Sequence, residues 1–395
     1  MRTYLRTHPW ITFSVDLARA NPKLWIMLGE CQSKCEHLAK VPLRPSTAKE
    51  LNQVYLAKGI QATTAIEGNT LSEEQVLQHV RGELTLPPSQ EYLKQEVDNI
   101  LRASHEIAEK VKAGAKMTLS SERVRELNAQ VLHGLDVDDE VLPGTVRSHS
   151  VVVGSVYRGA PAEDCGYLLE ELCAWINGPQ FSPAGTMADY KFIFAILRAV
   201  LAHLYLAWIH PFGDGNGRTA RLVEVEILMT SGLPMPATNL LSSHYNKTRS
   251  EYYRQLDRAS KSNGEVVPFI EYAVQGFLDG LREYIARVWE QQYDVTWCSY
   301  VHEIFRDAVR AEGRRKQLVL DLSRQEKPVT RVQIAELTPR LVKHYARNTD
   351  KRLIRDLNDL VERGLIVKEG NAYRANKEII LSFLPLRAPD TAKAQ

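Results

Sequence analysis

A glycine-rich loop with one histidine, one aspartate and two arginines contains the residues best suited to chemistry. The loop runs from His210-Pro211 through Phe212-Gly213-Asp214-Gly215-Asn216-Gly217 to Arg218 and Arg221. Glycines let the backbone approach a ligand closely, and the free N–H groups at the start of a following helix can bind an anion. The pattern therefore predicts a phosphate site.

The charged side chains make this prediction more specific. Arg218 and Arg221 fall at the start of the following helix, where the positive dipole end disfavours cations, so a polyphosphate should compensate them. Asp214 could hold Mg²⁺, which typically takes one or two protein carboxylates together with phosphate oxygens. His210 lies at the rim of the loop, and a neutral imidazole there could take a proton from an attacking hydroxyl.

Two common nucleotide-binding loops are excluded. No Gly-Lys-Ser/Thr closes the loop, as a Walker A motif requires, and no strand precedes it, as a dinucleotide-binding fingerprint requires. The simpler interpretation is a glycine-rich helix connection with a capping aspartate and solvated arginines. The combination of His, Asp, Gly, Asn and two Arg argues against that interpretation.

The segment 210–221 resembles the complete signature of the Fic family, whose members are mostly helical and typically transfer AMP from ATP onto a protein hydroxyl. The resemblance implies that His210 is the general base and Asp214 the metal ligand. It implies ATP and Mg²⁺ at the site and a target protein with a Tyr, Thr or Ser hydroxyl. It is also compatible with auto-modification and with a homodimer. The implied phosphate ligands are Gly215, Asn216, Gly217, Arg218 and Arg221.

A flap is suggested by Gly144-Thr145-Val146-Arg147 and the run Val151, Val152, Val153 and Gly154, which is similar to the segment leading into the family's target-binding hairpin. Taken alone, the β-branched run favours an ordinary hairpin without a functional role. Ala160-Pro161 replaces the family's longer proline run, which leaves the target preference open. Segments 241–245 and 249–253 also resemble the family, although Tyr252 and Tyr253 are expected to be packing or interfacial aromatics.

An inhibitory motif of Fic proteins, Ser/Thr-x-x-x-Glu-Gly/Asn, is matched by Thr63, Glu67 and Gly68 at the end of a helix expected near 51–68. Outside that resemblance, a Glu before a helix-ending Gly indicates only a solvated face. In the family the Glu pairs with the second arginine of the signature, here Arg221. Glu67 would then occupy donors that a γ-phosphate uses, and inhibition would be intramolecular.

These motifs lie in a chain of 395 residues, enough for two or three domains. With 44% apolar and 25% charged residues, the composition excludes disorder for the whole chain. A strongly apolar helix is expected over 186–209, because Pro211 disfavours helical geometry in His210. A second helix is expected from Arg218 to about Ser231. His203 is expected to be a core histidine. The expected fold class is mainly α, and the resemblance implies a Fic-type helical core with a short β-hairpin flap, followed by a C-terminal part that resembles a winged helix-turn-helix.

Charge separates the C-terminal part from the rest. Residues 301–375 carry 17 Lys and Arg against 11 Asp and Glu, whereas residues 1–300 carry 30 against 35. This asymmetry indicates a boundary near 311–316. The expected organisation is an N-terminal helical region over 1–110, a Fic catalytic core over 111–300, a winged helix over 314–376 and a flexible tail over 387–395.

In the C-terminal module we expect a helix from Leu318, a strand at 329–330, helices over 331–337 and 349–363 starting at an Asn348 or Thr349 cap, and wing strands at 364–367 and 372–373. Two kinds of partner, DNA and protein, are compatible with the charges of this module. Exposed cations suit phosphate contacts in a DNA groove, whereas interspersed acids favour protein recognition. The cations are Arg347, Lys351, Arg352 and Arg355, and the acids are Asp350, Asp356, Asp359 and Glu362.

The remaining features predict a cytoplasmic protein with no membrane partner. Five cysteines without a Cys-x-x-Cys pair fit a reduced compartment, and the N-terminus lacks the apolar core of a signal peptide. The most apolar stretch, 192–209, is interrupted by Arg198 and His203, which favours a buried helix over a membrane span. A protein adenylyltransferase is the favoured function. The alternatives are a hydrolase or bifunctional enzyme that removes AMP, use of a different phosphate donor, and a DNA-binding regulator.

Overall fold

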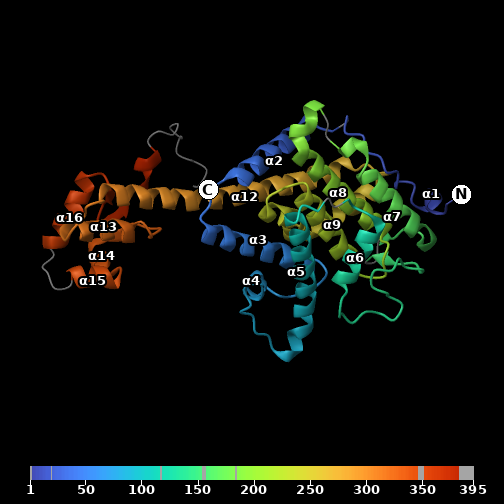
Figure 1. The fold of residues 1–395 in the computed structure, drawn as a ribbon, viewed down its shortest axis with the longest axis horizontal. Helices are drawn as coiled ribbons and strands as arrows, with labels where there is room; N and C mark the ends of the chain where they lie inside the picture. The colour runs from blue at the N-terminus through green and yellow to red at the C-terminus, as the bar shows by residue number, and fades with distance from the viewer. Residues whose placement is uncertain are drawn as a thin grey trace. The chain divides into compact units, whose positions relative to one another are not determined.

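The computed structural model describes residues 2–18, 20–115, 118–153, 157–182, 185–345 and 351–381. The chain divides into two compact units, 1–286 and 287–395, and both are mainly helical (Figure 1). The division falls within α12 (Val267–Ile304), upstream of the segment 311–316 where the charge changes. The finer domain boundaries stay predictions.

Three helices of the first unit begin at residues whose side chains cap them. The side chains of Asn21, Ser72 and Ser120 accept backbone N–H bonds at the starts of α2, α4 and α6. The α-helices are α1 (Tyr4–Thr7), α2 (Pro22–Lys40), α3 (Pro45–Ala65), α4 (Glu73–Arg81), α5 (Glu91–Lys112), α6 (Ser121–Val131), α7 (Ala162–Ile176), α8 (Lys191–Ile209), α9 (Asn216–Thr230), α10 (Leu240–Lys247) and α11 (Arg249–Lys261). Short 3₁₀ helices are η1 (Pro88–Gln90), η2 (Pro179–Phe181), η3 (Gly185–Tyr190) and η4 (Met235–Asn239).

Helices α8 and α9 form the centre of this unit. α8 is apolar on nearly all sides and packs against α9, α7 and α2, while α9 packs against α3, α5 and α6 (Figure 1). Among the described residues, Met187–Ile209 is the one segment long and apolar enough to cross a bilayer, and most of it is buried inside the fold. α8 ends at Ile209, as predicted, but it begins at Lys191 instead of at residue 186, because Gly185–Tyr190 forms η3. α9 begins two residues before the predicted Arg218. The α8–α9 loop therefore lies among helices distant in sequence.

The predicted hairpin is present in the first unit. Strand β1 (Val152–Val153) pairs antiparallel with β2 (Tyr157–Arg158), with Val152 opposite Arg158 and Val153 opposite Tyr157. The backbone N–H of Gly159 also donates to the carbonyl oxygen of Val151 at 3.1 Å. Gly154, which we assigned to the flap, lies outside the described residues.

The second unit combines helices with a three-stranded antiparallel sheet of order β3-β5-β4. The strand predicted at 329–330 is present with its predicted ends. The helices predicted from 318, over 331–337 and over 349–363, and the strands predicted at 364–367 and 372–373, are present with shifted ends, and one helix, α15, was not predicted. Residues 346–350, with Arg347, Asp350 and the predicted cap, lie outside the described residues, as does the tail 387–395. The elements are α13 (Ala311–Leu322), β3 (Val329–Thr330), α14 (Arg331–Glu336), α15 (Pro339–Tyr345), α16 (Lys351–Glu362), β4 (Ile366–Glu369), β5 (Ala372–Ala375) and η5 (Lys377–Leu381).

The apolar sides of these elements meet in one core. α16 directs Leu353, Leu357 and Leu360 inward, where they pack with Leu318 of α13 and Ile366 of β4. The spacing of the three leucines places them on one face of the helix, so the opposite face is left to polar residues. The core therefore fixes which side of α16 can meet a partner.

Candidate active site

The backbone at His210 is held in an uncommon conformation by the guanidinium of Arg147. His210 caps the C-terminus of α8 with φ 50°, in the left-handed region that few non-glycine residues adopt. Arg147 Nε donates to the carbonyl oxygen of His210 at 2.7 Å. Its Nη1 and Nη2 atoms donate to the carbonyl oxygens of His149 at 2.6 Å and Ala160 at 2.5 Å. Arg147 therefore links the His210 backbone by hydrogen bonds to the segment that contains the hairpin.

The imidazole of His210 is kept neutral by its surroundings. Burial lowers the pKa of His210 to about 4, and the charge of Arg147 acts in the same direction. A hydrogen bond with the backbone of Ala207 and the carboxylates of Glu67 and Asp214 raise the pKa, but they do not overcome the effect of burial. At pH 7 the ring can therefore accept a proton from a nearby hydroxyl.

The predicted phosphate cradle lies at the N-terminus of α9. Asn216 fixes the loop, because its Oδ1 accepts the N–H of Phe212 and its Nδ2 donates to the carbonyl oxygen of Phe212, both at 2.9 Å. Asp214 Oδ1 accepts the N–H of Gly215 at 2.6 Å. The first N–H groups of the helix, at Asn216 and Gly217, have no intrahelical acceptor. Free N–H groups at a helix start can bind an anion, and the phosphate-binding role of Gly215, Asn216 and Gly217 stays a prediction.

Asn128 of α6 is hydrogen-bonded to this loop and was not predicted from the sequence. Its Nδ2 donates to the carbonyl oxygen of Asp214 at 3.0 Å and to Thr219 Oγ1 at 3.2 Å, and its Oδ1 accepts the N–H of Gly144 at 3.0 Å. Asn128 is fully buried. Its partners are distant in sequence, so no local sequence pattern indicates that Asn128 holds the loop.

Arg218 and Arg221 are both almost completely buried, at 5% and 1% exposure. Arg221 Nη2 donates to the carbonyl oxygen of Thr63 at 2.9 Å and to Glu67 Oε1 at 2.5 Å. The Nε atoms of both arginines have no hydrogen-bond partner among the described residues. A buried donor without an acceptor is costly, so these two donors fit an anionic ligand.

Glu67 lies in the turn that follows α3, one residue before Gly68. Gly68 has φ 109°, which L-residues with side chains rarely adopt, so glycine is needed for this turn. The turn brings the carboxylate against Gly217, where an added Cβ would overlap Glu67 Oε1. Burial opposes ionisation of Glu67, but the charge of Arg221 and its hydrogen bond lower the pKa of Glu67 below its ordinary value. The pair that the motif predicted is therefore in contact and ionised at neutral pH.

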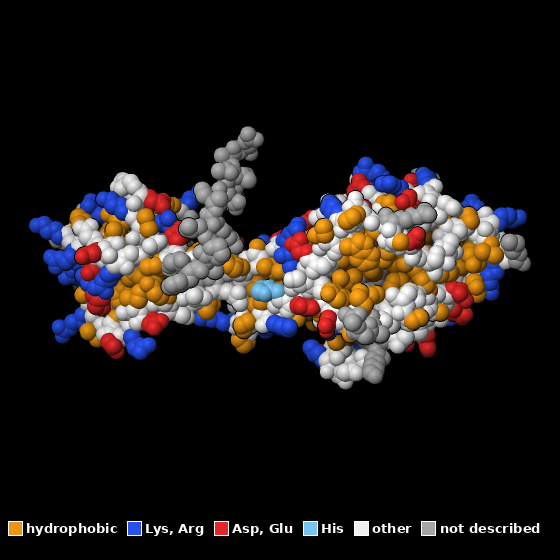
Figure 2. Space-filling view, turned by 90° about the horizontal axis from the view of Figure 1, so that it is seen from above, with side chains coloured by type: hydrophobic (Ala, Val, Ile, Leu, Met, Phe, Trp, Pro, Cys, Tyr) orange, Lys and Arg blue, Asp and Glu red, His pale blue; other side chains and the backbone are white. Residues whose placement is uncertain are grey.

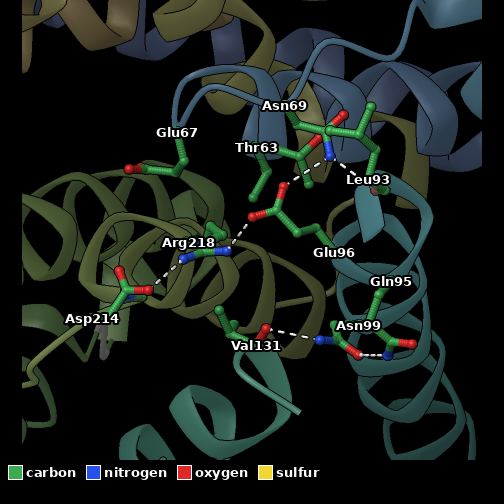
Figure 3. A network of polar contacts seen from close by, with 12 residues as sticks. Thr63, Glu67, Asn69, Leu93, Gln95, Glu96, Asn99, Val131, Asp214 and Arg218 are labelled. Carbon is green, nitrogen blue, oxygen red and sulfur yellow. Dashed lines mark hydrogen bonds and ion pairs between the residues drawn. The ribbon is translucent and has the colours of Figure 1, made fainter. Parts of the chain in front are cut away.

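A further carboxylate, Glu96 of α5, was not predicted from the sequence. Its Oε1 accepts from Arg218 Nη1 at 2.7 Å, and its Oε2 accepts from Asn69 Nδ2 at 2.8 Å (Figure 3). On its other side Arg218 donates to Asp214 Oδ2 at 3.2 Å. Arg218 is thus bound by two carboxylates, from α5 and from the loop.

A buried polar cluster contains His203, Tyr252, Tyr245 and Glu224. His203 is fully buried, as predicted for a core histidine, and its Nε2 lies 2.8 Å from the hydroxyl of Tyr252. The hydroxyl of Tyr245 donates to Glu224 Oε1 at 2.9 Å. Tyr252 is buried and packs in this cluster, whereas Tyr253 is 42% exposed.

The hairpin borders a hollow beside the α8–α9 loop. The hollow has a volume of about 390 Å³ and is lined by Val151 and Val152, by Gly213 of the loop and by the acidic segment 138–140. The side chain of Val152 is 53% exposed. The flap role of Val151, Val152 and Val153 stays a prediction, although the hairpin does lie next to the loop.

Comparison with known proteins identifies the central segment. Residues 118–228 match the model of the Fic/DOC family. Protein adenylyltransferase fic-1 of Caenorhabditis briggsae is 32% identical over 226 residues, which are 56% of this chain and 40% of that protein. Protein adenylyltransferase Fic of Nematostella vectensis is 26% identical over 253 residues, 63% of this chain and 53% of that protein. The chain thus spans about half the length, or less, of these relatives.

Solved structures agree in fold. Fic-1 (residues 134–508) of Caenorhabditis elegans superposes with a TM-score of 0.55 at 24% identity, over 67% of this chain and 73% of that one. A Fic family protein of Desulfovibrio desulfuricans G20 superposes with a TM-score of 0.53 at 20% identity, over 90% of this chain and 96% of that one. Residues 118–228 therefore match the Fic/DOC family model, and part of the chain is similar in sequence to Fic protein adenylyltransferases at about 30% identity.

Proposed function

We propose that this protein is an adenylyltransferase that transfers AMP from ATP to a Tyr, Thr or Ser hydroxyl of a target protein. The observation that carries this proposal is the α8–α9 loop. It places the neutral imidazole of His210 beside a helix N-terminus and two buried arginines whose Nε donors lack partners among the described residues. A base next to a phosphate cradle suits attack of a hydroxyl on a nucleotide phosphate.

In this reaction His210 removes the proton of the target hydroxyl as its oxygen bonds to the α-phosphorus of ATP. The bond from that phosphorus to the bridging oxygen breaks, and pyrophosphate leaves. The N–H groups at the start of α9 bind phosphate oxygens, and Arg218 and Arg221 neutralise the charge of the outer phosphates.

Asp214 is the residue that would hold Mg²⁺. Its carboxylate is half exposed at the loop, and Mg²⁺ typically takes one or two protein carboxylates together with phosphate oxygens. Among the residues that the structure describes, no cluster of three or more His, Cys, Asp or Glu side chains could hold a metal without substrate. This donor set fits an ion that arrives with a nucleotide. When bound there, the ion supplies charge neutralisation between phosphates.

We further propose that Glu67 inhibits the transfer. Its carboxylate occupies an Nη2 donor of Arg221 that a γ-phosphate would use, and it lies directly against Gly217 in the cradle. ATP bound beside it would be displaced from the position for in-line attack. The alternative is that the same site removes AMP from a modified protein, with Glu67 positioning the attacking water.

The position of the label in ATP tests the proposed reaction. The purified protein and its Glu67→Gly variant are incubated with Mg²⁺, a cell lysate and ATP labelled at either the α- or the γ-phosphate. We expect protein bands labelled only from the α-phosphate. Label from the γ-phosphate would indicate phosphoryl transfer, and no label from either form of ATP would contradict the proposal. Release of AMP from pre-modified proteins by the wild type would instead support the hydrolase.

A second candidate function, DNA contact, is favoured by the surface of α16. Asp356 is 1% exposed and bonds to Arg314 Nε at 2.7 Å and to the hydroxyl of Tyr345 at 2.8 Å, so it adds no negative charge to the outer face. Asp359 pairs with Arg363 at 2.9 Å. The exposed residues in the first turns are Lys351, Arg352, Ile354 and Arg355. Lys and Arg side chains are frequent on the surface of this unit (Figure 2).

We therefore propose that the second unit is a winged helix-turn-helix whose α16 contacts DNA phosphates. The full-length protein is titrated with a fluorescent duplex at several salt concentrations. We expect log K to fall with log salt by about 0.9 per phosphate contacted, and Lys351→Ala or Arg352→Ala to reduce that slope by about 1. Lys49→Ala, which removes an exposed cation from the first unit, is the matched control. A flat salt dependence, or no binding to any duplex, would indicate a protein partner instead.

A further inference from the structure

The carboxylate of Glu96 connects the phosphate-binding arginine to the turn that carries Glu67. Each of its oxygens has a different partner: Oε1 accepts from Arg218 Nη1 at 2.7 Å and Oε2 from Asn69 Nδ2 at 2.8 Å (Figure 3). Asn69 lies only two residues after Glu67. One side chain of α5 is thus bonded both to an expected ligand of ATP and to the neighbourhood of the inhibitory residue.

On the Asn69 side, Glu96 is part of a set of bonds that fixes the turn after α3. Asn69 Nδ2 also donates to the carbonyl oxygen of Leu93 at 2.9 Å, and its Oδ1 accepts the N–H of Leu71 at 3.0 Å. The backbone N–H of Asn69 donates to the carbonyl oxygen of Thr64 at 3.1 Å. These bonds hold the turn against α5, so the position of Glu67 depends on them.

On the Arg218 side, Glu96 supplies the closer of two carboxylates. The Arg218–Asp214 distance is 3.2 Å, and the carboxylate of Asp214 is half exposed, whereas that of Glu96 is 21% exposed. A charged hydrogen bond in a less hydrated setting is the stronger one. Glu96 therefore has the larger share in setting the direction of the Arg218 guanidinium, whose buried Nε has no hydrogen-bond partner among the described residues.

We propose that Glu96 is a positioning residue with two opposite effects on the enzyme. By orienting Arg218 it favours nucleotide binding, and by anchoring Asn69 it keeps Glu67 in its inhibitory contact with Arg221. Loss of Glu96 then weakens nucleotide binding and loosens the inhibition together, whereas loss of Asn69 loosens the inhibition alone. The second effect rests on the proposed autoinhibition, and the first does not.

The nucleotide effect is measured by calorimetry with a non-hydrolysable ATP analogue and Mg²⁺, in a Glu67→Gly background that removes the inhibitory carboxylate. We expect Glu96→Ala to weaken analogue binding by about tenfold, and Asn69→Ala to change it by less than about twofold. Glu96→Gln keeps the side-chain volume but loses the charge, so it tests the role of the charge in a protein that should still fold. We expect it to weaken analogue binding by at least about threefold. Glu109→Ala, which removes an exposed carboxylate from the same helix, is the matched control. Unchanged affinity in a folded Glu96→Gln protein would overturn the role at Arg218.

The inhibition effect is measured with Glu67 present, as incorporation of α-phosphate label. We expect Asn69→Ala to raise labelling severalfold without raising the KM for ATP. Labelling at the wild-type level in this variant would overturn the anchoring role, provided that Glu67→Gly is active. If Glu67→Gly transfers no AMP, the proposed function fails, and the analogue affinities still decide the role of Glu96 at Arg218.

Discussion

His210→Ala is expected to reduce AMP transfer by about 10²- to 10⁴-fold while leaving ATP affinity within about twofold of the parent protein. The reason is that in the proposed reaction His210 takes the proton of the attacking hydroxyl, whereas the α9 N-terminus, Arg218 and Arg221 would bind the phosphates. Transfer is measured as α-phosphate label in the Glu67→Gly background, and affinity by calorimetry. His37→Ala, at an exposed histidine of α2, is the matched control.

The pH dependence of the same transfer gives a second readout of His210. Because burial lowers its pKa to about 4, the ring stays neutral as the pH falls below the ordinary histidine value of about 6.5. The rate should therefore change little between pH 8 and about pH 5.5 and fall only in more acidic buffer. Wild-type transfer rates in the His210→Ala protein, or a rate that already halves near pH 6.5, would show that a buried neutral His210 is not the base.

Much of the fold could be predicted because its signals are local. Pro211 stops α8 at Ile209, and the β-branched run before Gly154 forms the predicted hairpin. The start of α9 was placed two residues late because Gly215 serves as its N-cap, so Asn216 and Gly217 already belong to the helix. α15 was missed, since it is short and follows α14 almost at once.

In the candidate site, too, residues with local sequence signals were predicted and residues with long-range contacts were not. Residues within the loop, from His210 to Arg221, follow from one contiguous motif, and the contact of Glu67 with Arg221 followed from a second motif. Arg147 appeared in the sequence only as part of a resemblance, without a role. Glu96 and Asn128 were not found at all, because each is one polar residue on an amphipathic helix and bonds to partners far away in sequence. Only tertiary packing reveals that such a residue holds a loop.

Glu67→Gly is the change with the largest expected gain of activity. It removes the carboxylate that lies 2.5 Å from Arg221 Nη2 and frees that donor for a γ-phosphate. We expect labelling to rise by about tenfold or more, if the charged pair contributes at least about 1.4 kcal/mol to the inhibited state. Glu67→Gln is the matched variant, because it retains an oxygen acceptor but loses the charge, and it should be only partly activated. Labelling is followed as auto-modification and as lysate bands.

Arg221 decides whether this activation works as proposed, since its side chain both anchors Glu67 and would orient the γ-phosphate. The double variant Glu67→Gly with Arg221→Ala should therefore be inactive instead of activated. Full activity in the double variant would mean that Arg221 does not bind the nucleotide. If Glu67→Gly alone stays at the wild-type level while His210 is shown to be required, Glu67 is not inhibitory. Should Glu67→Gly instead abolish removal of AMP from a pre-modified target, Glu67 takes part in catalysis and the hydrolase becomes the function.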